Sequence, residues 1–272
     1  TSIAAVHALT QIEAWPGAAA AAVVAGPDGT IASHGDADRV HPWASVTKLL
    51  TALAALVAME EGTIDLDEAA GPEGSTVRHL LAHASGLPFE PGGPTGSPGK
   101  RRVYSNVGFE TLAAHIAGRA EMPFDEYLAA GVLRPLQMGA DLRGSAASEL
   151  HGSLDDLLAF GRELQRPTLV APETLAEATT VQFPGLAGVL PDFGRFDPLD
   201  WGLGFELRDA KGVAASAVTG LSVDFSQMKP RGRYTRSEDA ARYFRLVRYA
   251  GAILFPLRSS AATGTTPEKA DE

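Results

Sequence analysis

The 272-residue sequence contains no cysteine. A chain without thiols has no cysteine nucleophile, no thiolate zinc site and no iron–sulfur cluster. Long apolar runs are also missing, because the two longest, 18–24 and 49–59, fall well short of the roughly 20 residues that cross a bilayer. No basic stretch followed by an apolar one is found near the first residue. We therefore expect a soluble chain with no transmembrane segment, cytoplasmic by default.

Basic residues are the scarcer charge, since 23 Lys and Arg stand against 33 Asp and Glu and the net charge is −10. Such a chain repels a phosphate backbone, so we expect no nucleic-acid partner. The charge is also uneven, with 13 basic and 27 acidic residues over 1–209 but 10 and 6 over 210–272. This change predicts a boundary near residue 210, between a domain over 1–209 and a divergent C-terminal tail over 210–272.

The periodicity of the apolar residues predicts helices in the middle of the chain and strands before and after them. The turn Gly-Pro-Asp-Gly at 26–29 separates two apolar runs and predicts a β-hairpin. The Gly- and Pro-rich segment 71–100 is interpreted as a surface loop. We expect an α+β fold, with a sheet built from both ends of the chain and an inserted, mainly helical lobe over about 63–195. The predicted helices cover 3–14, 44–61, 109–120, 124–130, 153–164 and 172–180, and the predicted strands cover 18–24, 30–33 and 201–207.

Two histidines, His79 and His83, are four residues apart, which would place both on one face of a helix as possible zinc ligands. The glutamate of a His-Glu-x-x-His motif is missing, because Leu80 occupies that position, and no third ligand stands out. The pattern therefore favours a structural role at the end of a short helix over a metal site.

The spacing Ser-x-x-Lys occurs three times, with serines at 45, 97 and 226. A hydroxyl and an amine three residues apart meet only on a helix, and only Ser45 opens a predicted one, because Pro and Gly accompany the other two pairs. Its hydroxyl would lie at the positive end of the helix dipole and its amide would be available to an oxyanion, with Lys48 as the neighbouring amine. The alternative is that Ser45 only caps the helix and Lys48 is a solvated cation in its first turn.

A second group, Tyr104-Ser105-Asn106, precedes the helix predicted over 109–120. A tyrosine, whose ordinary pKa is about 10, shuttles protons only when a nearby cation lowers that value, and Lys48 could supply this charge. The alternative makes Tyr104 a partly buried aromatic side chain and Asn106 the N-cap of the next helix. The basic run at 100–102 could favour an anionic substrate group or help to lower the pKa of Tyr104. The simpler interpretation is that it forms three solvated surface charges.

Together these motifs resemble the β-lactamase-related serine hydrolases, a family that includes class C β-lactamases, D-alanyl-D-alanine peptidases and esterases. The two groups occur in the family's usual order, and the resemblance covers about 1–209. It rests on the segments at 45–48, 80–88, 104–106, 134–138, 151–153 and 201–205.

The resemblance implies an antiparallel sheet flanked by N- and C-terminal helices, with the helical lobe inserted. It implies that Ser45 is the nucleophile that forms an acyl-enzyme, that Lys48 takes its proton and that Tyr104 shares the proton transfer. Asn106 would hold Lys48 and bind the substrate. No metal or organic cofactor is implied, and the partner is a small acyl substrate: an ester, a peptide or a β-lactam.

The family's third motif has no counterpart here. Lys-Thr-Gly, Lys-Ser-Gly or His-x-Gly should follow the segment at 201–205, but none of these tripeptides occurs after Trp201. In related enzymes that strand supplies a second oxyanion donor, and the loss of one such donor lowers turnover by about 10²–10³. A fused, frameshifted or artificial C-terminal segment would explain the loss. The alternative function is a catalytically incomplete member of the fold that acts as a binding or structural protein.

Overall fold

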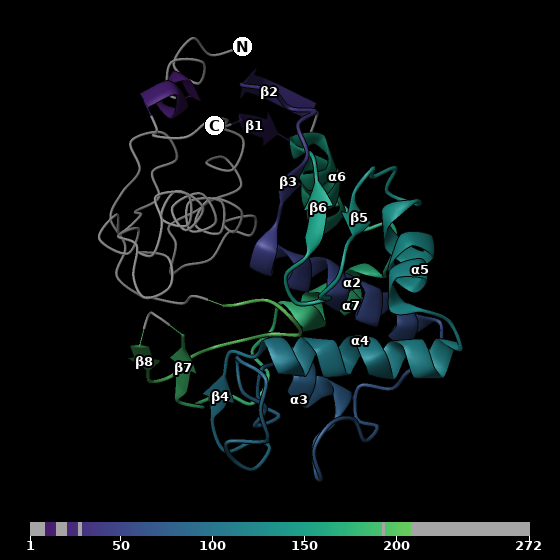
Figure 1. Ribbon diagram of the computed structural model, residues 1–272, viewed down its shortest axis with the longest axis vertical. Helices are drawn as coiled ribbons and strands as arrows, with labels where there is room; N and C mark the ends of the chain where they lie inside the picture. The colour runs from purple at the N-terminus through teal and green to yellow at the C-terminus, as the bar shows by residue number, and fades with distance from the viewer. Residues whose placement is uncertain (1–8, 15–20, 27–28, 192–193, 208–272) are drawn as a thin grey trace. The chain divides into compact units, whose positions relative to one another are not determined.

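The computed structural model describes residues 9–14, 21–26, 29–191 and 194–207 (Figure 1). The chain forms two units, Thr1–Arg39 with Arg208–Glu272, and Val40–Leu207. The tail expected over 210–272 lies outside the described residues.

The described part of the first unit is a short helix and a hairpin. The 3-10 helix η1 (Thr10–Ala14) lies within the segment expected to be helical, 3–14, whose first residues lie outside the described ones. Strands β1 (Ala22–Gly26) and β2 (Gly29–His34) pair antiparallel, with an irregularity in the register at the middle of β1. The predicted hairpin is therefore confirmed.

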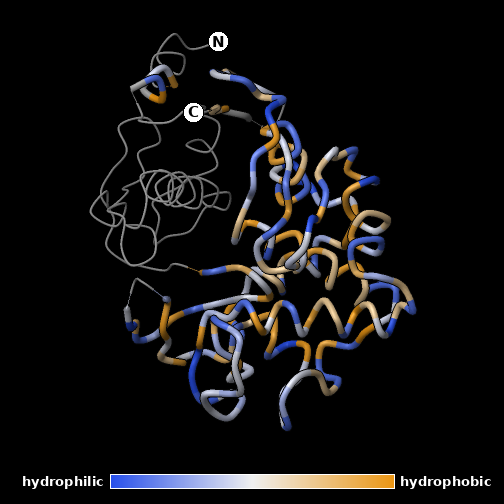
Figure 2. Tube along the Cα trace, in the orientation of Figure 1, coloured by the Kyte–Doolittle hydropathy of each residue, from blue (hydrophilic) through white to orange (hydrophobic). Residues whose placement is uncertain are grey.

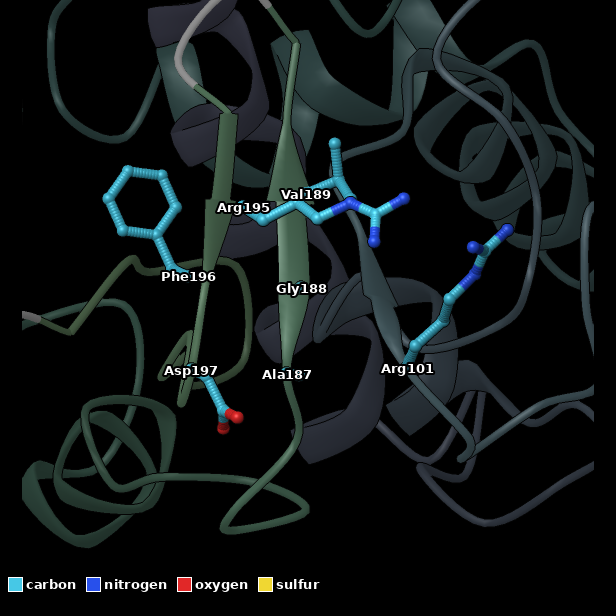
Figure 3. Close-up of a pocket in the computed structure, with 7 residues that line it drawn as sticks. All are labelled: Arg101, Ala187, Gly188, Val189, Arg195, Phe196 and Asp197. Atoms are coloured by element: carbon cyan, nitrogen blue, oxygen red, sulfur yellow. The ribbon is translucent and has the colours of Figure 1, made fainter.

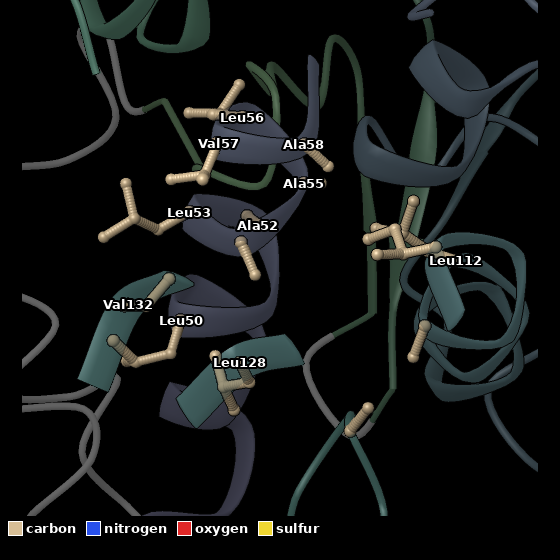
Figure 4. Close-up of a cluster of buried hydrophobic side chains, with 14 of the residues drawn as sticks. Leu50, Ala52, Leu53, Ala55, Leu56, Val57, Ala58, Leu112, Leu128 and Val132 are labelled. Carbon is tan, nitrogen blue, oxygen red and sulfur yellow. The ribbon is translucent and has the colours of Figure 1, made fainter. Parts of the chain in front are cut away.

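Helix α2 (Thr47–Glu60) lies at the centre of the second unit and follows a single 3-10 turn, η2 (Ala44–Val46). Every residue from Leu50 to Ala58 is buried, as expected of an Ala- and Leu-rich helix that is apolar on all sides. The helix ends where Gly62 adopts a φ of 75°, next to the end predicted at residue 61. It packs against α4 (Asn106–Ala120), α5 (Phe124–Leu128) and the π-helical η3 (Ala129–Leu133) (Figure 4).

Helix α4 buries one face. Its buried residues begin at Gly108 and Phe109 and continue at Leu112, Ala113 and Ile116, which is helical spacing. Figure 2 shows apolar and polar residues alternating along this helix. No helix in the described part of the chain is long and apolar enough to cross a membrane.

Local signals predicted two further helices well. Helix α6 (Leu154–Gln165) begins with a capping box between Ser153 and Asp156, and α7 (Pro172–Ala178) begins with proline. The prediction of a surface loop over 71–100 is incomplete, because this segment contains helix α3 (Val77–Leu81). That short helix forms because Thr76 caps it and its apolar residues are buried against α4.

Short strands complete the second unit. Strands β3 (His41–Pro42), β6 (Leu150–Gly152) and β5 (Asp141–Leu142) form one antiparallel sheet. In the other sheet β4 (Arg102–Val103) pairs parallel with β7 (Gly188–Leu190), which pairs antiparallel with β8 (Gly194–Phe196). Strands β1 and β2 pair with each other. The sheet expected from both ends of the chain also needs C-terminal residues that lie outside the described ones.

The strand predicted over 201–207 is wrong. Residues 201–206 form a tight turn, closed by a bridge between Trp201 and Glu206 and by a hydrogen bond from the Gly202 amide to the Phe205 carbonyl (2.8 Å). Gly204 has a φ of 89°, and a Cβ there would lie 2.2 Å from the Cβ of Ala52 in α2. The small residues that suggested a strand are therefore required by a turn pressed against the central helix.

Candidate active site

Ser45 lies in the 3-10 turn before α2 and is half-buried. The first amide bonded within this turn is that of Val46, which donates to the Trp43 carbonyl at 3.0 Å. The Ser45 amide precedes it and is therefore not used by the helix. The neighbouring Ala44 has a φ of 41°, a left-handed conformation that is strained for alanine and typical of functional sites.

The proposal that Ser45 merely caps the helix is wrong. The N-cap residues are Trp43 for η2 and Val46 for α2, and neither makes a side-chain capping bond. Among the described residues, the hydroxyl of Ser45 has no hydrogen-bond partner. Its position thus leaves the hydroxyl available to a reactant.

The strained turn is held by the segment that ends in β6. The amide of Trp43 donates to the Leu150 carbonyl (2.8 Å) and its indole Nε1 donates to the Gly152 carbonyl (3.1 Å). The Leu150 amide in turn donates to Thr47 Oγ1 at 3.0 Å. A Cβ at Gly152 would lie 2.6 Å from the Trp43 ring, so glycine is needed for this close approach.

Lys48 is almost completely buried, with 2% of its surface exposed, so its interpretation as a solvated cation is wrong. Its Nζ donates to Asn106 Oδ1 at 2.6 Å and to the Ala147 carbonyl at 2.8 Å. The same nitrogen lies 4.8 Å from the centroid of the Tyr104 ring. Three of the four expected site residues therefore meet here, one helical turn after Ser45.

Asn106 is the first residue of α4. The alternative that made it the N-cap of this helix is therefore wrong. Ser105 is the cap, and its Oγ accepts a hydrogen bond from the Gly108 amide at 2.7 Å. Because Ser105 does the capping, the side chain of Asn106 can face Lys48.

Tyr104 directly follows β4 and its amide donates to the Val189 carbonyl at 3.2 Å. Its ring lies in an aromatic cluster, with centroids 4.6 Å from His83, 5.7 Å from Trp201 and 5.9 Å from Phe89. The description of Tyr104 as a partly buried aromatic side chain is thus correct, and it is compatible with a role beside Lys48.

The two histidines do not share a helix face, because α3 ends at Leu81 and His83 lies beyond it with a φ of 55°. His79 Nδ1 is 2.9 Å from Thr76 Oγ1, and the ring stacks on Phe183. No group of three or more potential ligands able to hold a metal ion occurs in the parts of the chain that the structure describes.

His83 is buried, and its Nδ1 accepts a hydrogen bond from the Ser105 amide at 3.0 Å. Burial holds the pKa of this imidazole well below its usual value, and the charges of Lys48 and Arg102 lower it further. The ring is therefore neutral, with its proton on Nε2.

Arg102 is fully buried, so the prediction of three solvated charges at 100–102 is wrong at this position. Its guanidinium donates to four backbone carbonyls and joins three separate segments of the chain. Burial lowers its pKa to about 10, an effect that the charge of Asp200 opposes. The carbonyls belong to Ala82, Gln182 (2.7 Å), Phe183 (3.3 Å) and Leu199 (2.5 Å).

Sequence reasoning missed Arg102 as a structural residue, although one signal was present. Arg102 and Tyr104 are two apart, so on a strand they share a face, and a half-buried tyrosine implies a half-buried neighbour. The strand register agrees with a buried Arg102, because Arg102 lies opposite Gly188 on the face of the sheet that carries Leu199.

A shallow cavity of about 330 Å³ lies at this small sheet. Arg101 and Arg195 extend toward the same side of it, whereas Asp197 points away from them (Figure 3). Tyr104 is not among the residues that line this cavity.

A family model described as Beta-lactamase matches residues 5–235, and a second, described as Protein of unknown function (DUF3160), matches residues 206–271. No curated protein matches the chain. The boundary expected near residue 210 lies inside the first match and stays a prediction.

Solved structures resemble the chain over most of its length. A β-lactamase from Mycobacterium bovis is 49% identical, with a TM-score of 0.74, and the match covers 75% of this chain and 77% of that one. A D-stereospecific amidohydrolase from Streptomyces sp. is 21% identical, with a TM-score of 0.59 and coverage of 75% and 82%. A β-lactamase/D-alanine carboxypeptidase from Yersinia pestis, complexed with citrate, is 18% identical, with a TM-score of 0.59 and coverage of 78% and 84%.

Proposed function

Because the chain belongs to the β-lactamase family, with the α+β fold expected from its sequence, we propose that it is a serine acyl hydrolase that forms an acyl-enzyme through Ser45. The substrate would be a small ester, amide or β-lactam. Lys48 carries this proposal, because a buried lysine is rare unless it is paired or functional. Its two acceptors, Asn106 Oδ1 and the Ala147 carbonyl, hold it one turn from the serine.

Lys48 would act as the general base in acylation. To act as a base, the charged Lys48 must first lose one proton; the neutral amine then has two N–H groups and one lone pair. With the N–H groups donated to Asn106 Oδ1 and the Ala147 carbonyl, the lone pair is the position that would take the proton of Ser45. The bond from Ser45 Oγ to the acyl carbon forms as the O–H bond breaks, and the amide of Ser45 would donate to the developing oxyanion.

Tyr104 would share the return of this proton. Its ring lies beside the Lys48 amine, so its hydroxyl is a candidate to pass the proton to the leaving group when the bond from the acyl carbon breaks. Water then attacks the acyl-enzyme, its proton goes to the same pair, and Ser45 regains its hydroxyl proton. Asn106 would keep Lys48 in place throughout and contact the substrate carbonyl side.

A covalent probe tests this function directly. The full chain is incubated with a fluorophosphonate and, separately, with a β-lactam, and its intact mass is measured. We expect one adduct per chain that is absent in Ser45→Ala. As a matched control, Ser97→Ala removes the serine of a second Ser-x-x-Lys pair, at an exposed loop, and should be labelled like the parent. Failure of every probe to label the parent chain would refute the proposal.

A second candidate function is a binding or structural protein on the same fold, favoured by the missing third motif. It predicts that no adduct forms and that Ser45→Ala leaves the affinity for a ligand such as a boronate or an intact β-lactam unchanged. Calorimetric titration of both chains separates the two functions, because a hydrolase loses the covalent part of boronate affinity when Ser45 is removed.

A further inference from the structure

The segment that carries Tyr104 has hydrogen-bonding groups on two edges. On one edge the amides of Arg102 and Tyr104 donate to the carbonyls of Ala187 (2.9 Å) and Val189 (3.2 Å), at β7. The amides of the alternate residues point to the other edge, as the pleat of a strand requires. A strand would normally supply their acceptors.

No strand lies on that other edge among the described residues, and one residue, His83, supplies both acceptors. Its main-chain carbonyl accepts from the Val103 amide at 2.9 Å, and its ring Nδ1 accepts from the Ser105 amide at 3.0 Å. His83 therefore bonds the backbone on both sides of Tyr104.

The conformation of His83 makes this double role feasible. Its φ of 55° turns the chain at the end of α3, so that the carbonyl and the ring face the same segment. The ring is also packed on three sides, with centroids 4.6 Å from Tyr104, 5.0 Å from Phe109 and 4.8 Å from Trp201. Its Nδ1 is thereby fixed in direction and not only in distance.

We propose that His83 is a positioning residue for Tyr104 and Asn106, acting through the amides that flank the tyrosine. This inference rests on the proposed hydrolase function. Asn106 follows Ser105 directly and accepts a hydrogen bond from Lys48, and Tyr104 precedes Ser105, so a shift of the Ser105 backbone would displace two of the residues that lie against the amine. A misplacement of about 1 Å in such a group can lower a rate by about 10²-fold.

The positioning bond requires a neutral imidazole. A second proton on Nδ1 would oppose the Ser105 N–H and would add a charge close to Lys48 on α2 and Arg102 on β4. Both cations and the burial of the ring favour the neutral form, so the bond persists through the neutral pH range.

Two substitutions isolate the ring acceptor. In His83→Asn the side-chain oxygen can replace Nδ1, and asparagine tolerates the left-handed backbone. In His83→Leu the side chain has a similar shape but no acceptor. Phe160→Leu, in the core along α6, is the control for lost stability, because Phe160 is fully buried and makes no aromatic contact with this cluster.

Two readouts are measured on each full-length variant. The first is hydrogen exchange at the Ser105 amide, which needs no activity. The second is the rate of Ser45 labelling by a fluorophosphonate, resolved into the limiting rate and the half-saturating concentration. In His83→Leu we expect exchange to be about tenfold faster or more, and the limiting rate to fall by about 10–100-fold with an unchanged half-saturating concentration. His83→Asn should recover most of both.

Two results would overturn the proposal: exchange at Ser105 in His83→Leu equal to that of the parent, or labelling no slower than in Phe160→Leu. If His83→Leu does not fold, His83→Gly replaces it, because glycine adopts the same backbone conformation without an acceptor. If the parent chain is not labelled at all, the hydrolase function fails, and the exchange measurement alone decides whether His83 holds this segment.

Discussion

Acidification should destabilise this protein through His83, and the effect can be isolated by one substitution. The imidazole is buried and neutral, with its Nδ1 engaged by the Ser105 amide. Burial, Lys48 and Arg102 all lower its pKa, so the native chain resists taking up a proton that the unfolded chain binds readily. Lowering the pH through the usual histidine range is therefore the perturbation.

The magnitude follows from proton linkage. The unfolded imidazole titrates near its ordinary pKa of 6.5, whereas the folded pKa lies well below it. Between these two values the unfolded state binds more protons, so stability rises with pH and is lost as the pH falls below 6.5. One proton changes the free energy of unfolding by about 1.4 kcal/mol per pH unit, and the loss between about pH 7.5 and about pH 5.5 is about 1.4 kcal/mol.

The assay is urea unfolding of the parent and His83→Asn at about pH 7.5, 6.5 and 5.5. The other ionisable groups are the same in both chains, so their effects on stability cancel in the difference. They include His79, whose pKa is also lowered by burial. We expect the stability advantage of the parent over His83→Asn to shrink by about 1.4 kcal/mol across this range. An advantage that is the same at all three values would refute the burial of a neutral imidazole.

Four further substitutions, at three positions, test other parts of the site. Lys48→Met should lower the rate of Ser45 labelling by at least about 10²-fold while the chain stays folded, and an unchanged rate would rule Lys48 out as the base. Arg102→Met should reduce the free energy of unfolding by about 3 kcal/mol or more, measured in urea, because several buried carbonyls lose their donor at about 1–3 kcal/mol each. Arg102→Lys should recover only part of that, since one ammonium does not span these acceptors, and full recovery would contradict this. Gly152→Ala should cost about 1–3 kcal/mol, because the new Cβ would clash with the Trp43 ring, and a change below about 0.5 kcal/mol would show that the ring moves aside without cost.

The sequence predicted best those elements that carry their own signals. The bounds of α2 and α6 follow from an apolar run that ends at glycine and from a capping box, which are properties of neighbouring residues. The hairpin of β1 and β2 follows from its turn residues in the same way.

The wrong predictions share a physical cause: contacts with distant segments determine the structure at these positions. Trp201 to Phe205 alternate like a strand, but Gly204 lies against Ala52, 152 residues earlier in the sequence, and a turn results. Arg102 stands in a basic run that looks solvated, yet its acceptors come from carbonyls 20 to 97 residues away in sequence. No local pattern contains that information.

The candidate site joins two halves, each fixed from far along the chain. The Ser45 half is held by carbonyls of the segment before β6, such as that of Ala147, 99 residues from the lysine it binds. The Tyr104 half is held by His83, whose Nδ1 accepts a hydrogen bond from the Ser105 amide, 22 residues away in sequence. The bond between Lys48 and Asn106 spans 58 residues and is a direct polar contact between these halves. Motif spacing therefore identifies the participants, whereas their alignment depends on the separate anchors, and a substitution at an anchor should impair catalysis without touching a motif residue.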